Sequence, residues 1–323
     1  MKAVVCTEFG PIERLAIHDV PEPALRAGCV RIAMKSVTVN PPDLLMPQGK
    51  YQVKPMPPFV AGVEGAGVVL ESGEGVAGFA PGDRVMTYAG EGCFAEQVVV
   101  PAFRVFRTPD GMDDDAAAGF ILVYGTAHHA VVDCGELARG QTLTVLGAAG
   151  GIGIAAIQIG KALGASVIAI ASTPEKLAKC REHGADHLVL NSEPIRDRIR
   201  ELTGGRGADV ILDVVGGDVT NVALRAIAPY GRYVIAGYAS GVIPMIQGNL
   251  VVLKQAKVVG ASFRLLLEQT PDLGIRSVQK LCELYETGLL RPEVSARYPF
   301  DRFLEAMRLV ADRKVIGKVA IRL

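Results

Sequence analysis

The stretch from Thr142 to Lys176 constrains the fold of this chain most strongly, because it has the pattern of one strand–helix–strand unit. A short apolar run rich in β-branched residues opens it at 142–146, and a cluster of glycines follows at once. Apolar residues then recur at helical spacing until Gly164, which is a typical helix stop. A second buried strand is expected at 167–171. The pattern predicts a βαβ unit with glycines at the first strand-to-helix turn.

The glycines at this turn have a physical purpose. A residue without a Cβ lets the backbone turn sharply, and it lets a pyrophosphate approach the amides at the helix N-terminus, where the macrodipole favours negative charge. The spacing is a G-x-x-G-x-x-G variant, and glycine clusters also form plain turns, so the flanking strands and helix carry the argument. The sequence predicts a dinucleotide site formed by Gly147, Ala149, Gly150, Gly151, Ile152 and Gly153.

The end of the second strand indicates which nicotinamide cofactor is preferred. An NAD-selective strand usually ends in Asp or Glu, which accepts from the ribose 2′-OH and repels a 2′-phosphate. This strand ends in Ala171-Ser172, and Thr173 and Lys176 follow in the next turn. In the alternative interpretation, Ser172 and Thr173 only cap the helix and Lys176 is solvated. We expect NADPH rather than NADH, with Ser172, Thr173 and Lys176 as phosphate contacts.

The bulk properties exclude several classes of protein. A chain of 323 residues suggests about two domains. Its net charge is +0 and no basic stretch is interleaved with aromatic residues, so nucleic acid is not an expected partner. The start of the chain lacks a signal-peptide pattern, and no apolar run reaches membrane-spanning length. The 6 cysteines are scattered without a C-x-x-C motif. We expect a cytoplasmic protein with reduced cysteines and no membrane partner.

Along the chain the composition changes from a β-rich module to an alternation of strands and helices. Residues 1–122 read as short strands separated by Pro and Gly, with a turn at Asn40-Pro41-Pro42-Asp43. Residues 123–263 alternate strand and helix, giving about six parallel strands. The last strand, at 315–321, is expected to return to the first module. We predict an α/β protein with a β-rich domain at 1–122, completed by 264–323, and a doubly wound parallel sheet at 123–263.

These segments together resemble the medium-chain dehydrogenase/reductase superfamily, and most closely its zinc-independent, zeta-crystallin-like NADPH:quinone oxidoreductase branch. The resemblance covers nearly the whole chain and implies a GroES-like catalytic domain, a Rossmann cofactor domain and a nicotinamide in the cleft between them. It also implies a homodimer built through the edge strand of the cofactor domain, between Val258 and Phe263. The marks that carry it are Val39-Asn40-Pro41, 62–69, Gly82-Asp83-Arg84-Val85, 147–153, Glu175-Lys176-Leu177 and Gly317-Lys318.

Departures from the zinc-dependent pattern of this family predict that no metal is bound. Where relatives carry a cysteine and a Gly-His-Glu, this chain has Asn40-Pro41-Pro42-Asp43 and Gly62-Val63-Glu64, and only Cys93 lies in the region of the structural zinc loop. Glu64 is then either a remnant of a zinc ligand set or, as we prefer, a paired carboxylate that orders the domain floor. His128 and His129 are adjacent on a helix and point in different directions, so we do not expect them to bind a metal together.

The resemblance implies roles for four further residues. Asn40 would lie at the nicotinamide, where its amide hydrogen-bonds the ribose or the substrate carbonyl, and Thr126 would hold the ribose or the carboxamide. Tyr51 is either the proton donor proposed for related enoyl reductases or a packed aromatic residue. Lys318 either touches the cofactor or is a solvated strand residue. The backbone after Asp213, at the end of a predicted strand, would line the nicotinamide side.

Three functions are compatible with these residues. The first is NADPH-dependent reduction of a quinone, and the second is reduction of an activated C=C bond in an enone or enoyl thioester; both need hydride transfer to an electron-poor π system. Leu45 and Pro47 stand where some quinone reductases carry Tyr and Arg, and the run from Met46 to Tyr51 is as similar to the enoyl-thioester reductase branch. The third is a non-catalytic NADPH-binding protein, against which the presence of both Asn40 and Tyr51 argues.

Overall fold

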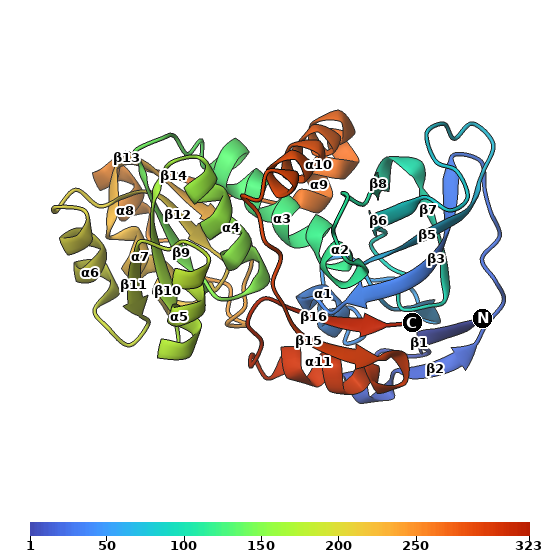
Figure 1. Ribbon diagram of the computed structural model, residues 1–323. Coiled ribbons are helices and arrows are strands. Elements are labelled where there is room, and N and C mark those ends of the chain that lie inside the picture. Colours follow the sequence, from blue (N-terminus) through green and yellow to red (C-terminus); the bar gives the residue numbers. More distant parts are fainter. The chain divides into compact units, whose positions relative to one another are not determined.

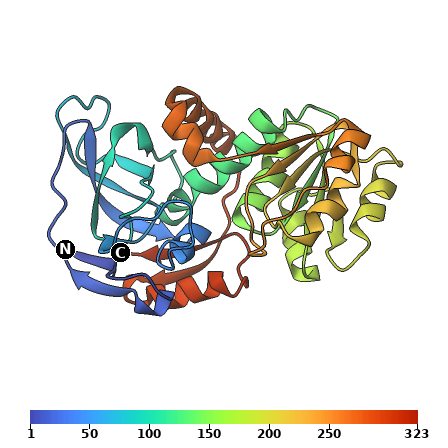
Figure 2. The same ribbon diagram turned by 180° about the vertical axis from the view of Figure 1, so that it is seen from behind.

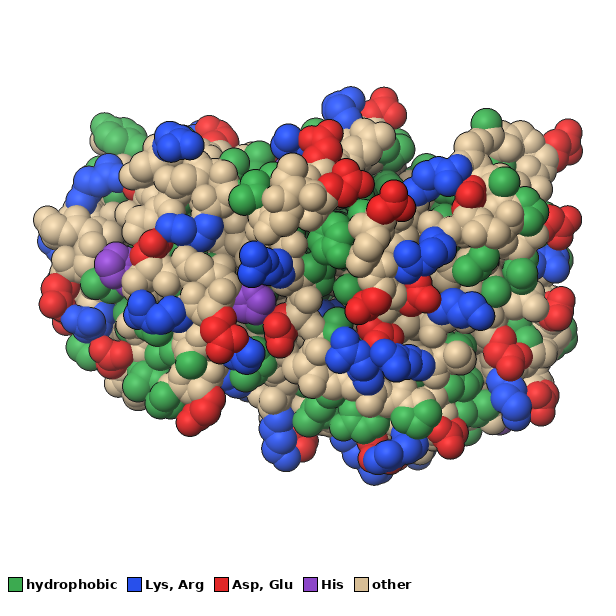
Figure 3. All heavy atoms as spheres, in the orientation of Figure 1, with side chains coloured by type: hydrophobic (Ala, Val, Ile, Leu, Met, Phe, Trp, Pro, Cys, Tyr) green, Lys and Arg blue, Asp and Glu red, His purple; other side chains and the backbone are tan.

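The computed structural model describes residues 1–323, and the chain forms two compact units. Met1–Leu122 and Pro292–Leu323 form the first, here called the β-rich unit, and Val123–Arg291 form the second, here called the Rossmann unit (Figure 1). No helix combines the length and the apolar composition that crossing a bilayer requires. On the face drawn in Figure 3, basic and acidic side chains are interspersed, as the net charge of +0 leads one to expect.

The β-rich unit is built on two sheets of mainly antiparallel strands. The larger has the strand order β15-β16-β3-β5-β6-β8, with β7 also paired to β3, and the smaller has the order β2-β1-β4. The strands are β1 (Lys2–Cys6), β2 (Ala16–Asp19), β3 (Cys29–Thr38), β4 (Phe59–Val60), β5 (Glu64–Ser72), β6 (Arg84–Tyr88), β7 (Gln97–Pro101), β8 (Val105–Arg107), β15 (Val294–Pro299) and β16 (Lys318–Arg322). The helices are α1 (Pro41–Leu45), α2 (Asp114–Ala118) and α11 (Phe303–Ala311), with 3₁₀ turns η1 (Ile12–Arg14), η2 (Ala102–Arg104) and η4 (Phe300–Arg302).

Glycines allow the two longest strands of this unit to pack closely. A Cβ on Gly67 in β5 would lie 2.0 Å from the carbonyl oxygen of Ala33 in β3, and one on Gly65 would lie 2.3 Å from the Met34 side chain. The small residues at 62–69 therefore have the tight strand packing expected of them. The closing strand also returns to this unit as predicted, because β16 pairs with β3, with Ala320 opposite Thr38.

The segment expected to be a turn at 40–43 is instead the start of a short helix, α1. Asn40 is its N-cap, and the Asp43 carboxylate accepts a hydrogen bond from the Asn40 backbone N–H at 2.8 Å. The turn prediction was wrong because it took the two prolines at the first helical positions as turn residues. They are compatible with a helix there, because backbone N–H groups of the first turn have no intrahelical acceptor.

The Rossmann unit has a six-stranded parallel sheet in the order β11-β10-β9-β12-β13-β14, which confirms the predicted doubly wound fold. Helices cover both faces, with α4 and α5 on one and α7 and α8 on the other (Figures 1 and 2). The strands are β9 (Thr142–Leu146), β10 (Ser166–Ala171), β11 (His187–Leu190), β12 (Ala208–Asp213), β13 (Ile227–Ile235) and β14 (Lys257–Gly260). The helices are α3 (Phe120–His128), the π-helix η3 (His129–Cys134), α4 (Gly151–Ala162), α5 (Pro174–Glu182), α6 (Ile195–Leu202), α7 (Asp218–Leu224), α8 (Gly248–Lys254), α9 (Phe263–Gln269) and α10 (Pro271–Glu286).

Residues 264–291, which the sequence assigned to the first domain, belong to the Rossmann unit in the structure. The reason is packing at both ends of this segment. The Phe263 ring fills the space beside Gly125 on α3, where a Cβ would lie 2.5 Å from it. Gln158 on α4 accepts from the Arg291 N–H at 2.7 Å and donates to the Arg291 carbonyl at 2.9 Å. The chain leaves this unit only after these contacts are made.

Candidate functional site

The turn between β9 and α4 presents open backbone N–H groups at a helix N-terminus. Gly147 has a φ of +71° and turns the chain, and the first helical hydrogen bond runs from Ile154 N to Gly150 O at 2.9 Å. The N–H groups of Gly151, Ile152 and Gly153 therefore come before the first intrahelical donor. Gly150 is exposed, and Gly151 and Ile152 are half-buried. This glycine cradle, 147–153, fits a bound pyrophosphate.

Steric space in the glycine cradle explains which glycines it needs. A Cβ on Gly153 would lie 2.5 Å from the carbonyl oxygens of both Gly147 and Ala148. A Cβ on Gly147 would lie 2.9 Å from methyl groups of Val214 and Val215. At Gly150 the nearest atom would be 3.5 Å away, so the absence of a side chain there serves the open surface rather than the packing.

The valines that pack on Gly147 belong to the loop after β12, which meets the glycine cradle where the strand order reverses. Asp213 ends β12 and lies beside Leu146, the last residue of β9. In open α/β sheets ligands bind at this point, outside the carboxyl ends of the strands. The sequence singled out the backbone after Asp213, and the structure places it beside the cradle.

Asp213 itself is fully buried and holds this loop in shape. One carboxylate oxygen accepts from the N–H groups of Val215 and Gly216, both at 2.8 Å. The other accepts from the hydroxyls of Thr220 at 2.6 Å and Tyr233 at 2.8 Å. Burial and the Asp213 charge raise the pKa of Tyr233, so its hydroxyl remains a donor. The sequence did not predict the roles of Thr220 and Tyr233, because nothing in their local pattern links them to Asp213.

The residues predicted to contact a 2′-phosphate lie at the end of β10 and the start of α5. Thr173 is the N-cap of α5 and accepts from the Lys176 N–H at 3.3 Å. The Lys176 ammonium donates to the Ser172 hydroxyl at 3.2 Å, and Ser172 is exposed. The helix-cap interpretation is therefore correct for Thr173. It does not exclude the phosphate role, because the three polar side chains are grouped at the helix start.

In the β-rich unit a buried carboxylate, Glu64, is the centre of a second group of polar residues, here called the Glu64 cluster. Its Oε1 accepts from Thr38 Oγ1 at 2.8 Å, Asn40 Nδ2 at 2.9 Å and Lys318 Nζ at 2.9 Å. Its Oε2 accepts from the Leu122 N–H at 3.0 Å. The interpretation of Glu64 as a paired carboxylate that orders the domain floor is confirmed. The alternative of a solvated Lys318 is wrong, because this side chain is buried between β16 and the start of α1.

The Glu64 cluster fixes the Asn40 side chain completely. Its amide nitrogen donates to Glu64 and to the Thr38 carbonyl at 3.2 Å, and its Oδ1 accepts from Lys318 Nζ at 2.5 Å. Since an ammonium is donor-only, Lys318 determines which end of the amide faces it.

Asp43 lies directly beneath this cluster and is also fully buried. Its two oxygens accept from the N–H groups of Asn40 at 2.8 Å and Val63 at 3.0 Å. Burial raises the pKa of Asp43 to about 7, although both hydrogen bonds and the Lys318 charge act against the shift. Burial likewise raises the pKa of the neighbouring Cys93 thiol.

Tyr51 lies in a different unit from Thr126 and the histidine pair, which are close together on α3 and η3. Tyr51 is half-buried in the loop that follows α1, and Thr126 is buried on α3 of the Rossmann unit. His129 Nδ1 lies 2.9 Å from Asp133 Oδ2 and does not share a ligand position with His128. The structure has no group of three or more His, Cys, Asp or Glu side chains that would hold a metal ion.

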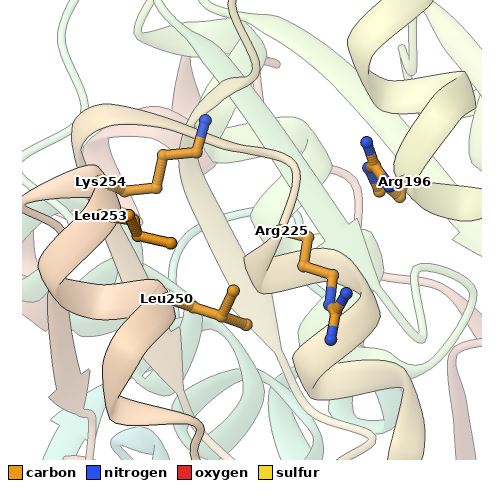
Figure 4. Close-up of a pocket in the computed structure, with 5 residues that line it drawn as sticks. All are labelled: Arg196, Arg225, Leu250, Leu253 and Lys254. Carbon is orange, nitrogen blue, oxygen red and sulfur yellow. The ribbon is translucent and has the colours of Figure 1, made fainter.

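A separate hollow of about 220 Å³ lies on the helices α6, α7 and α8 (Figure 4). Leu250, Leu253 and Lys254 of α8 line one side of it, and Arg196 and Arg225 line the other (Figure 4). None of the predicted site residues lines it. The candidate site is therefore the glycine cradle with the β10–α5 residues in one unit, and the Glu64 cluster in the other.

Comparison with known proteins yields matches along nearly the whole chain. The family model described as zinc-binding dehydrogenase matches residues 151–278, and the alcohol dehydrogenase GroES-like domain matches residues 26–110. The quinone oxidoreductase-like protein 2 homolog of Nematostella vectensis is 37% identical over 99% of this chain and 88% of its own.

Two mycobacterial proteins extend this comparison. The mycoketide-CoA synthase of Mycobacterium tuberculosis is 32% identical over 97% of this chain, which corresponds to 7% of that protein. A mycobacterial protein solved in complex with NADPH is 28% identical over 100% of both chains, with a TM-score of 0.94.

Proposed function

Because the chain belongs to the medium-chain dehydrogenase/reductase family, in its quinone oxidoreductase type, we propose that it is an NADPH-dependent reductase that transfers a hydride to a quinone. The single observation that carries the proposal is the glycine cradle, which lies where the strand order reverses. Two carbonyl oxygens occupy the space that a side chain at Gly153 would need. Its relatives include a quinone oxidoreductase-like protein and a protein solved with NADPH.

The residues of the Rossmann unit would hold the cofactor as follows. The N–H groups of Gly151, Ile152 and Gly153 donate to the pyrophosphate, and Gly147, Ala149 and Gly150 leave the approach open. Ser172, Thr173 and Lys176 contact the 2′-phosphate, for which Lys176 supplies a point charge. Thr126 holds the nicotinamide ribose or carboxamide. When bound, NADPH supplies the hydride.

The Glu64 cluster narrows what Asn40 does in this proposal. Both amide protons of Asn40 already have protein acceptors, which argues against donation from this amide to a substrate carbonyl and favours a contact with the ribose. Lys318 has three protein acceptors, Glu64, Asn40 and the Val39 carbonyl, within 3.4 Å. We therefore place Lys318 behind Asn40, as the residue that orients its amide; its direct contact with the cofactor stays a prediction.

The second candidate function is reduction of an activated C=C bond in an enone or enoyl thioester, and the 32% identity to the mycoketide-CoA synthase favours keeping it. The two chemistries make different demands on Tyr51. Water can protonate the oxygens of a reduced quinone, whereas the carbon of an enolate benefits from a placed acid. As a phenol, Tyr51 is able to supply that proton.

The acceptor is tested by following NADPH absorbance with a quinone and with a crotonyl thioester, for the wild type and for Tyr51→Phe. We expect turnover of the quinone, with little loss in the variant. If an enoyl substrate is the true acceptor, the variant loses about a hundredfold in rate with it. Absence of turnover with both, together with retained NADPH binding, would leave the non-catalytic alternative.

The assembly and location of the protein complete the proposal. β14 is the last strand of the parallel sheet, and its outer edge is the place where a second copy would pair to form a homodimer between Val258 and Phe263. A cytoplasmic location agrees with the free cysteines. The mass in solution of the variant Val258→Pro tests the dimer. The Ala261 N–H, three residues on, donates to Ile235 of β13, so the Val258 N–H points to the open edge that proline would block.

A further inference from the structure

His129, Asp133 and Cys134 form a compact cluster on η3, the π-helix that continues α3. Asp133 Oδ2 lies 2.9 Å from His129 Nδ1, and Cys134 Sγ lies 3.5 Å from His129 Nε2. Each ring nitrogen thus has its own partner, one a carboxylate and the other a thiol. In this arrangement a base is able to activate a nucleophile while a third group orients the base.

The π-helix is what brings the thiol to the imidazole. In η3 the Gly135 N–H donates to the Ala130 carbonyl at 2.9 Å, five residues back, instead of four as in an α-helix. The wider turn places Cys134 over His129 while Asp133 stays close to the same ring. Gly135 permits this geometry, since a Cβ there would lie 2.7 Å from the Val131 carbonyl oxygen. Such π segments often occur at functional sites.

The charges around the cluster favour a protonated ring at His129. Burial alone would lower the pKa of His129, but hydrogen bonds with Asp133 and Cys134 raise it to about 9, so the ring carries a proton at neutral pH. A cation beside a sulfur stabilises the thiolate. Other charged groups on the packed elements are His128, whose pKa burial lowers, Lys280 on α10, Arg232 paired with Glu136, Asp209 paired with Arg206, Lys161 paired with Asp186, and the exposed Lys257.

We propose that Cys134 is a covalent modification site: a nucleophilic thiol, deprotonated by His129 and held by Asp133, that reacts with soft electrophiles containing an electron-poor C=C bond. Sγ forms a C–S bond to the β-carbon while the π pair of the alkene moves toward the carbonyl. The proton that left Sγ for His129 Nε2 then goes to the α-carbon. The thiol thereby adds across the double bond without an oxidant or a leaving group. Cys134 is partly exposed in the single chain, which this reaction requires, and its Sγ lies 3.8 Å from the Gly260 carbonyl oxygen of β14. Because β14 is also the proposed dimer edge, labelling is compared between the wild type and the Val258→Pro variant.

The proposal is tested on the full chain with N-ethylmaleimide, a small electron-poor alkene, at pH 6.5 and with limiting reagent. Peptide mass spectrometry at successive times gives the rate at each cysteine. Cys282 is the matched control, because it is also partly exposed in the Rossmann unit, but burial and the acidic neighbours Glu286 and Glu283 raise its pKa to about 11. We expect Cys134 to react at least about tenfold faster than Cys282.

Two variants separate activation from simple exposure. His129→Gln removes the base and is expected to slow labelling of Cys134 about tenfold at pH 6.5, with the difference shrinking above pH 9, where ordinary thiols ionise. Asp133→Asn keeps the shape and should give a smaller loss in the same direction. If His129→Gln does not fold, as judged by its circular dichroism, Asp133→Asn and the pH profile of the wild type decide. Labelling of Cys134 no faster than Cys282, or unchanged in the folded variants, overturns the proposal.

Discussion

The glycine cradle and the Glu64 cluster are held in their geometries in opposite ways. The cradle uses backbone groups from one continuous segment, 147–153, and works because side chains are absent there. The Glu64 cluster uses charged side chains from segments as far apart as Glu64 and Lys318, which are separated by 254 positions and are almost completely buried. One is an opening formed by local geometry, and the other is a filled core of ion pairs and hydrogen bonds.

The difference shows where each site is vulnerable. A helix N-terminus is tolerant of sequence changes around it as long as no Cβ enters the close approach of the backbone. A buried charge has no such tolerance, because removal of one partner leaves the other without compensation in a medium that solvates it poorly. Substitutions at the two places should therefore differ in kind, affecting ligand affinity at the cradle and folding at the cluster.

The largest effect is expected from Lys318→Met. It leaves the Glu64 carboxylate buried without its ammonium partner, which should lower the free energy of unfolding by about 3–5 kcal/mol, measured by denaturant titration. The double variant Glu64→Gln, Lys318→Met should recover part of this loss. Lys280→Met, which breaks the exposed pair with Glu283, is the control and should cost less than about 1 kcal/mol. If the two lysine substitutions lowered the free energy of unfolding equally, the buried ion pair of the Glu64 cluster would contribute no more than an exposed one.

The next effect is expected at the cradle. Gly153→Ala pushes a methyl group against two carbonyl oxygens and should cost about 2–3 kcal/mol of stability together with about a hundredfold in NADPH affinity. Gly150→Ala adds its methyl group where the nearest atom is 3.5 Å away, so folding should be unaffected and only cofactor binding should weaken. Calorimetric titration with NADPH and thermal unfolding separate the two. Unchanged affinity in Gly150→Ala would place the pyrophosphate elsewhere.

A pH dependence of stability should distinguish Asp43 from ordinary carboxylates. Its pKa of about 7 in the folded state lies above the usual 3.8, so the folded state holds a proton that the unfolded state releases. The stability from this proton is complete below about pH 4 and is lost as the pH rises to about 7, with a slope of at most about 1.4 kcal/mol per pH unit. Asp43→Asn should flatten that slope. Asp83→Asn should not, since hydrogen bonds from the Ala80 N–H and Arg107 lower the pKa of this half-buried carboxyl.

The smallest effect is expected from Lys176→Ala. Loss of one partly exposed cation from the phosphate contacts should reduce the preference for NADPH over NADH about tenfold, or about 1.4 kcal/mol, and leave NADH kinetics unchanged. Lys179→Ala on the same helix is the control, because that ammonium pairs with Glu182 at 2.7 Å. An equal ratio of the two cofactors' kcat/KM values in wild type and Lys176→Ala would remove Lys176 from the site.

Much of the fold was predictable because its signals are local. β9 begins and ends at the predicted residues, Thr142 and Leu146, and Gly147 after it has the positive φ that a sharp turn needs. A chain in which strands and helices of ordinary length alternate is compatible with few sheet topologies, because the crossovers between parallel strands are right-handed. The helix start at Ser172 and Thr173 was also predictable from the sequence. The N-cap residue and the proline at the first helical position favour a helix start through contacts within about four residues.

The sequence by itself therefore determined the βαβ unit and the glycine cradle, since their geometry depends on backbone conformation within a few residues. It did not determine that Lys318 is buried, that its ammonium orients Asn40, or that Asp213 collects hydroxyls from Thr220 and Tyr233. Those contacts exist only once β16 has paired with β3 and β13 with β12. From sequence alone, a charged residue in a strand is expected to be solvated. Only the tertiary structure brings in the buried carboxylate that stabilises the burial of its charge.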